Sequence, residues 1–139
     1  MNIIIDTNIF VSAILKDSMT RKILINAQEN FLFPEYILEE LRKHRNLFLK
    51  KSGLNENDYD LLIHTLLEYV TLVSDEAIET QLDESRKLIE HIDPKDVVFV
   101  ACGLVFLDSV IWSNDTDLKK QKRIGVLNTK EIIEVLGIA

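Results

Sequence analysis

Short apolar runs alternate along the chain with longer segments that have helical spacing. The short runs predict strands at Ile3–Ile5, Phe31–Phe33, Val70–Val73, Val110–Trp112 and Gly125–Leu127. Between them, apolar residues recur every three or four positions, which predicts helices in segments 36–48, 61–69 and 78–89. Strands that alternate with helices indicate βαβ units, a parallel sheet and helices on both faces. We therefore predict an α/β fold, a three-layer α/β/α sandwich.

Polar residues mark where several of these helices begin. Thr20 before RKILINAQ and Thr129 before KEIIEVL are predicted N-caps. Asp93 directly precedes Pro94, a pattern that predicts a cap followed by proline at the first helical position. The helical stretch between the second and third strands is interrupted near Ser52-Gly53-Leu54-Asn55. This interruption predicts a helical-hairpin insert that projects beyond the sheet, as a clamp or a dimer contact.

Length and composition place the chain among ordinary globular proteins. Its 139 residues predict one domain over 1–139, and 47% of them are hydrophobic and 28% charged. No apolar run approaches the roughly 20 residues that span a bilayer, and no signal peptide is expected. Cys102 is the single cysteine, which rules out an internal disulfide and fits a reducing cytoplasm. We expect a cytoplasmic protein without a membrane partner.

The net charge of −7 argues against a protein that coats nucleic acid by bulk electrostatics. Local basic segments are nevertheless present around Arg42–Arg45, at Lys50-Lys51 and at Lys119–Arg123. Each is typical of a solvated face, and each is also compatible with phosphate contacts beside an acidic site. The charge therefore leaves open an enzyme that acts on nucleic acid through local patches.

Carboxylates follow two of the predicted strands. Asp6-Thr7-Asn8 come directly after the first strand, and SNDTD at 113–117 comes after the fourth. Taken alone, the first of these stretches favours a helix cap at Asp6 or Thr7 over a site. Because ligands bind at the carboxyl ends of parallel strands, the repeated pattern predicts acids in one crevice. Like charges held there repel and raise some pKa values unless a cation compensates, and oxygen ligands suit Mg²⁺ or Mn²⁺.

Two further acids are candidates for the same crevice. Asp96 falls in the predicted first turn of the helix DPKDVVFVACGL, where the helix dipole alone would favour a carboxylate. Glu39 and Glu40 lie near the boundary of the buried side of their helix. Periodicity does not choose between these two glutamates.

Together these segments resemble the PIN-domain family of metal-dependent nucleases over essentially the whole chain. The resemblance rests on the order and spacing of Asp6-Thr7-Asn8, Glu40-Leu41, DVVFVA at 96–101 and SNDTD at 113–117. It implies a flavodoxin-like or Rossmann-like sandwich and endoribonuclease activity with Mg²⁺ or Mn²⁺. Many members are VapC-type toxins of toxin–antitoxin pairs, and PIN domains commonly form dimers.

The resemblance also implies roles for individual residues. The family's four acids match Asp6, Glu40, Asp96 and Asp115. A frequent fifth acid matches Asp117, and the supporting polar positions match Asn8 and Ser113. Glu40 is selected over Glu39 because the family's acid directly precedes an apolar residue. Toxin members often carry a small-residue, basic stretch after this acid, and RKHR at 42–45 departs from it, which leaves toxin status open.

The resulting hypothesis is metal-assisted hydrolysis of RNA. Asp6, Asp96 and Asp115 would bind one or two divalent ions, while Glu40, together with Asp117, would orient or deprotonate the attacking water. RNA contacts are predicted at Arg42, Arg45, Lys119 and Lys120. A homodimer is predicted because the helical insert is rich in apolar side chains, namely Tyr36, Phe48, Leu61, Leu62, Leu66, Leu67 and Tyr69.

Other classes fit less well. A response-regulator receiver needs an acid pair near the first strand, and Asp6 has no acidic neighbour. A haloacid-dehalogenase-like phosphatase needs a second acid at the position of Asn8. The remaining alternative is a catalytically inactive PIN-like domain that binds RNA or protein. An antitoxin partner and the RNA target are not readable from one chain.

Overall fold

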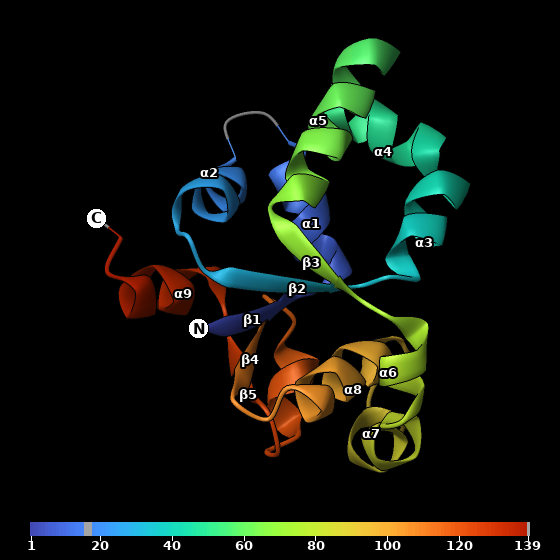
Figure 1. The fold of residues 1–139 in the computed structure, drawn as a ribbon, viewed down its shortest axis with the longest axis vertical. Helices are drawn as coiled ribbons and strands as arrows, with labels where there is room; N and C mark the ends of the chain where they lie inside the picture. The colour runs from blue at the N-terminus through green and yellow to red at the C-terminus, as the bar shows by residue number, and fades with distance from the viewer. Residues whose placement is uncertain (16–17, 139) are drawn as a thin grey trace.

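A parallel sheet forms the centre of the computed structural model, which describes residues 1–15 and 18–138 (Figure 1). The strands follow the order β3-β2-β1-β4-β5, and every neighbouring pair is parallel. They are β1 (Asn2–Ile5), β2 (Asn30–Pro34), β3 (Val70–Val73), β4 (Ser109–Trp112) and β5 (Gly125–Leu127). The predicted parallel sheet is therefore confirmed, with strand bounds within two residues of those expected.

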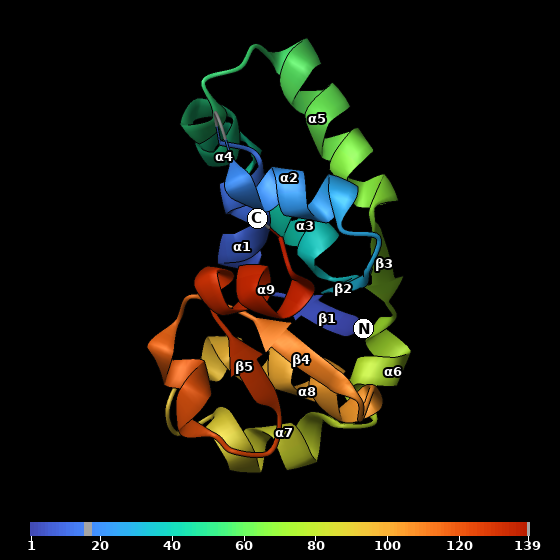
Figure 2. The same cartoon turned by 90° about the vertical axis from the view of Figure 1, so that its left-hand side faces the viewer.

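Helices cover both faces of this sheet. They are α1 (Thr7–Ala13), α2 (Met19–Asn26), α3 (Ile37–Lys43), α4 (Arg45–Ser52), α5 (Glu56–Glu68), α6 (Asp75–Glu79), α7 (Leu82–Ile89), α8 (Val97–Val105) and α9 (Thr129–Leu136), with 3₁₀ turns η1 (Pro94–Asp96) and η2 (Thr116–Lys120). Helices α1, α2 and α5 lie over one face, and α6, α7 and α8 lie over the other (Figure 1 and Figure 2). This arrangement is the predicted three-layer sandwich. In the described part of the chain, no helix combines the length and apolarity needed to cross a bilayer.

The strand order creates a switch point between β1 and β4. The chain builds β1, β2 and β3 in one direction and then returns to place β4 on the other side of β1. In register, Ile5 pairs with Trp112, so Asp6 and Ser113 follow their strands side by side. The order matches the first strands of the Rossmann arrangement, in which ligands bind outside the carboxyl ends at the switch point.

The central strands are buried on both faces, as their continuous apolar sequence requires. Ile3, Ile4 and Ile5 are all fully buried. Trp112 is also fully buried, and its indole N–H donates to the Thr129 hydroxyl over 3.0 Å, which satisfies its polar atom. This core makes the strand ends a rigid platform for the residues that follow them.

The predicted helical-hairpin insert is confirmed between β2 and β3. Helix α4 ends at Ser52. Its C-cap is Gly53, whose φ of 70° is the left-handed conformation that glycine adopts readily, and α5 begins three residues after Gly53. The single helix expected over 36–48 is instead two helices, because His44 has φ −107° and ψ 25° between α3 and α4. The hairpin extends beyond the sheet in both views (Figure 1 and Figure 2).

Two predicted helix caps are wrong by one or two residues. Ser18, and not Thr20, caps α2 by accepting from the Arg21 N–H. Asn128, and not Thr129, caps α9 and forms a capping box with Glu131. Sequence did not separate these neighbours because serine, threonine and asparagine all cap well.

The apolar side chains of the insert mostly complete the monomer core. Phe48 and Leu66 are buried, at 8% and 0% exposure. Leu61 and Tyr69 remain exposed, at 65% and 41%. The surface available for the predicted dimer contact is thus smaller than the sequence indicated.

Candidate active site

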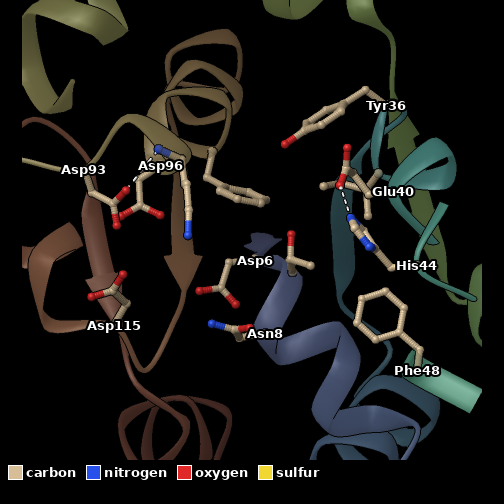
Figure 3. Close-up of a pocket in the computed structure, with 13 residues that line it drawn as sticks. Asp6, Asn8, Tyr36, Glu40, His44, Phe48, Asp93, Asp96 and Asp115 are labelled. Carbon is tan, nitrogen blue, oxygen red and sulfur yellow. Dashed lines mark hydrogen bonds and ion pairs between the residues drawn. The ribbon is translucent and has the colours of Figure 1, made fainter. Parts of the chain in front are cut away.

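A pocket of about 590 Å³ lies at the carboxyl ends of β1 and β4 (Figure 3). Carboxylates group on one side of it, and the helical insert forms the opposite wall. The lining residues are Asp6, Thr7, Asn8, Tyr36, Ile37, Glu40, His44, Phe48, Asp93, Lys95, Asp96, Phe99 and Asp115. The structure therefore brings Asp6, Asn8, Glu40, Asp96 and Asp115 into one pocket, although they are far apart in the sequence.

Asp6 is both a helix cap and a pocket residue. Its Oδ1 accepts the Ile9 N–H over 2.8 Å at the start of α1, and its Oδ2 accepts the Ser113 hydroxyl. Burial raises the pKa of Asp6, and the charge of Asp115 adds to this effect. The hydrogen bonds from Ser113 and Ile9 act in the opposite direction. The two interpretations drawn from the sequence are compatible.

Ser113 links the ends of the two central strands. Its hydroxyl donates to Asp6 and also accepts the backbone N–H of Asp115 over 3.0 Å. Asp115 in turn caps η2, because its Oδ1 accepts the Asp117 N–H over 2.9 Å. These bonds fix the positions of Asp6 and Asp115 relative to each other.

Asp96 lies in the first helical turn, as predicted, at the end of η1 and one residue before α8. Its side chain makes no capping bond and is only 6% exposed. Its Oδ2 has no hydrogen-bond partner among the described residues. Burial, followed by the charges of Asp93, Asp115 and Asp6, raises the pKa of Asp96 to about 7. These surroundings disfavour the ionised form of Asp96 unless a cation lies beside it. Metal binding therefore explains the position of Asp96 better than stabilisation of the helix does.

Three carboxylates of the pocket approach one another closely. One oxygen from each of Asp93, Asp96 and Asp115 lies within 4.8 Å of the others. All three donors are hard oxygens, which suit Mg²⁺ or Mn²⁺. Asp96 Oδ2 has no partner within residues 1–15 and 18–138, and this donor set fits a divalent cation.

Asp93 was identified from the sequence only as a cap. That role is confirmed, since its Oδ1 accepts the Lys95 N–H over 3.0 Å. Its position in the pocket was missed. The spacing in DPKD was the available signal, because a tight turn places acids three residues apart on the same side.

The opposite wall carries Glu40 together with aromatic side chains (Figure 3). Glu40 lies 3.3 Å from Nε2 of His44, and the His44 ring is edge-on to Phe48. Burial, and then the charge of Glu40, raises the pKa of Tyr36. Glu39 is exposed, so the structure places Glu40, and not its neighbour, in the pocket.

Residues 117–120 lie beside the pocket and not in its lining. Asp117 is paired with Lys120 over 2.8 Å, and Lys119 is paired with Glu131 over 2.6 Å. The charge of Asp117 still contributes to the raised pKa of Asp96. These lysines therefore already have acidic partners within the chain.

The basic residues predicted on the insert also lie outside the lining. Arg45 binds both carboxylate oxygens of Asp60, over 2.7 and 2.9 Å, and thereby ties α4 to α5. Arg42 is exposed on α3. Lys95 lines the pocket. The sequence did not predict this role, because Lys95 is a single lysine between two acids.

Comparison with known proteins identifies the family of this chain. The PIN domain family profile matches residues 4–132. The chain belongs to the PIN-domain family, as the resemblance in its sequence indicated. A search of curated proteins returned no match.

Among solved structures, one chain of "Crystal structure of VapBC2 from Rickettsia felis bound to a DNA fragment from their promoter" is similar, with a TM-score of 0.68. The two chains are 17% identical, and the similarity covers 92% of this chain and 98% of the other. At this identity the comparison establishes the common fold.

Proposed function

We propose that this protein is a divalent-metal-dependent endoribonuclease of the VapC type. The observation that carries the proposal is the buried Asp96 oxygen, which has no hydrogen-bond partner in the described part of the chain and lies beside other carboxylates at the switch point of the sheet. Burial of several acids together is unfavourable, so it indicates a function that uses their charge. Membership of a nuclease family supports the same reading.

Asp6, Asp96 and Asp115 are the residues that would hold the cation. Mg²⁺ and Mn²⁺ suit their oxygen donors. When bound, such an ion stabilises the charge that develops on phosphoryl oxygens and increases the acidity of water. The role of Ser113 is to hold Asp6 and Asp115 in the required orientation through its two hydrogen bonds.

Glu40 is the proposed general base. It lies in the wall opposite the carboxylate group, so a phosphodiester between the two walls would face both. Glu40 would orient the attacking water and accept its proton. Asn8, at the start of α1 and in the pocket lining, would position the same water or a phosphate oxygen.

The proposed substrate is RNA with accessible, unpaired bases. Lys95 supplies a positive charge in the pocket that can pair with a phosphate. Tyr36 and His44 present rings on the insert side, and unpaired bases stack on such side chains. Arg42 and the paired lysines at 119–120 would be secondary contacts along the strand.

Two protein partners are also proposed. The similar solved structure belongs to a VapBC complex, which supports a VapB-like antitoxin as the partner of this chain. Leu61 and Tyr69, both exposed on the insert, support a homodimer contact. Both partners are consistent with a toxin of a toxin–antitoxin pair that acts in the cytoplasm.

The test is cleavage of matched single-stranded RNA and DNA in millimolar Mg²⁺ or Mn²⁺, with a chelator as the negative arm. We expect cleavage of RNA only, dependent on the metal and lost in Asp6→Asn. RNA binding without cleavage by the wild-type protein would favour the inactive alternative. Equal activity in chelator would contradict the proposal.

A further inference from the structure

We infer that Asp93 is a direct ligand of the divalent cation, together with Asp96 and Asp115. This inference rests on the proposed metal-dependent function and assigns a further residue to that site. Asp93 is not one of the acids that the sequence predicts as metal ligands. Its role as a helix cap already accounted for an acid at this position.

The position of Asp93 is the first argument. The closely spaced group of oxygens consists of one each from Asp93, Asp96 and Asp115, within 4.8 Å of one another. Two oxygens on opposite sides of one Mg²⁺ are about 4.2 Å apart, twice the bond length. Small side-chain rotations therefore close the group around one ion.

The second argument is independent of proximity. Asp96 is only 6% exposed, and its Oδ2 lacks a hydrogen-bond partner among the described residues. Figure 3 shows its carboxylate next to that of Asp93 and directed into the pocket. An unpartnered buried carboxylate oxygen is costly, and a cation shared with Asp93 removes that cost.

The hydrogen bonds of Asp6 and Asp93 leave both side chains able to bind a cation. Each oxygen of Asp6 accepts one hydrogen bond, from Ile9 or from Ser113, and keeps a second lone pair. The cap bond of Asp93 uses Oδ1 alone. Oδ2 of Asp93 can therefore bind a cation while the cap is kept.

Pro94 restricts the backbone of the turn in which Asp93 acts both as a cap and as a metal ligand. Its ring fixes φ near −65°, which holds the turn between Asp93 and Asp96 in one shape. The two carboxylates are then presented together before any ion binds. Preorganisation of this kind lowers the cost of assembling a metal site.

The experiment is calorimetric titration of Mn²⁺ into the metal-free full chain without RNA. Asp93→Asn is the informative variant, because asparagine caps as well as aspartate and keeps the bond to Lys95. Asp83→Asn is the matched control, since it removes the same charge from a side chain that is 97% exposed. Asp96→Asn reports whether the pocket is the binding site.

We expect Asp93→Asn to weaken Mn²⁺ binding at least about tenfold, since even indirect partners of a metal contribute that much. Asp83→Asn should bind as the wild type does, and metal-free Asp93→Asn should be no less stable in urea. Wild-type affinity in Asp93→Asn, with loss in Asp96→Asn, would overturn the role of Asp93 and leave the proposed function intact. Wild-type protein that neither binds Mn²⁺ nor cleaves RNA would overturn both.

Discussion

The hydroxyl of Ser113 donates a hydrogen bond to Asp6 across the boundary between β4 and β1. The same oxygen accepts the backbone N–H of Asp115, so one side chain connects two acids from opposite ends of the chain. Because Ser113 is buried, water does not replace it easily. The geometry of the carboxylate group depends on this hydroxyl.

Ser113→Ala should therefore lower both stability and cleavage. Removing the hydroxyl leaves a buried Asp6 oxygen and an N–H without their partner, a loss of about 1–3 kcal/mol in the free energy of unfolding. Ser109→Ala is the control, because Ser109 begins β4, the strand that Ser113 directly follows, and its hydroxyl makes only a 3.5 Å bond to the Gly103 carbonyl. Urea unfolding and cleavage rates that are equal in the two variants would contradict the role of Ser113.

Glu40→Gln should reduce kcat about 100-fold or more, as expected for loss of a general base. The amide keeps the shape of the side chain, so stability and Mn²⁺ affinity should change little. Glu39→Gln is the matched control one residue away, on the exposed side of α3. A loss of kcat in Glu39→Gln as large as that in Glu40→Gln would contradict the assignment of Glu40 as the general base.

Stability of the metal-free protein should depend on pH through Asp96. The pKa of Asp96 is raised from 3.8 to about 7 in the folded state, so the folded chain binds the proton more tightly than the unfolded chain. Wild-type stability should thus fall relative to Asp96→Asn as the pH rises from about 4 to about 7, by at most about 4 kcal/mol.

This difference should be constant above that range, because Asp96 is then ionised in both states. Urea unfolding of both proteins in chelator, at about pH 5 and about pH 8, measures it. A wild-type to variant difference that does not change with pH would contradict the burial of the Asp96 charge.

Lys95→Gln should raise KM for RNA with a smaller effect on kcat. The substitution removes the positive charge of the pocket lining, and losing one phosphate contact should flatten the salt dependence of binding by about 0.7 in slope for single-stranded RNA. Lys130→Gln, on the exposed surface of α9, is the control. Equal salt slopes for the wild type and Lys95→Gln would argue that RNA does not contact Lys95.

Part of this site was predictable because strand-end acids in parallel sheets converge whatever the intervening sequence. Asp6 and Asp115 follow from that rule and from the paired register of β1 and β4. Glu40 was selected by resemblance alone, since periodicity left Glu39 equally suitable. In the structure Glu40 lines the pocket and Glu39 is exposed, because adjacent residues of a helix point in directions about 100° apart.

Other features depend on tertiary contacts that local patterns do not encode. No glycine or proline beside His44 predicts the break between α3 and α4. The pairing of Arg45 with Asp60 requires α4 and α5 to be adjacent. Arg45, which the sequence predicted as an RNA contact, therefore has a structural role. Asp93 was missed for another reason, because its capping role already explained it.

The assembly prediction concerns the exposed part of the insert. If Leu61 and Tyr69 lie in a two-fold contact, light scattering at micromolar concentration should give twice the 16.0 kDa mass of one chain. Leu61→Arg should shift that mass to the monomer while the chain stays folded. A wild-type mass near 16.0 kDa would contradict the dimer.

The most direct test of the carboxylate pocket is single-turnover cleavage of one end-labelled RNA in millimolar Mg²⁺. Wild type, Asp96→Asn and Asp83→Asn should be purified in parallel, so that a contaminating nuclease would appear in all three. The account predicts cleavage by the wild type and by Asp83→Asn, and none above background by Asp96→Asn. Equal cleavage by Asp96→Asn and the wild type would contradict it.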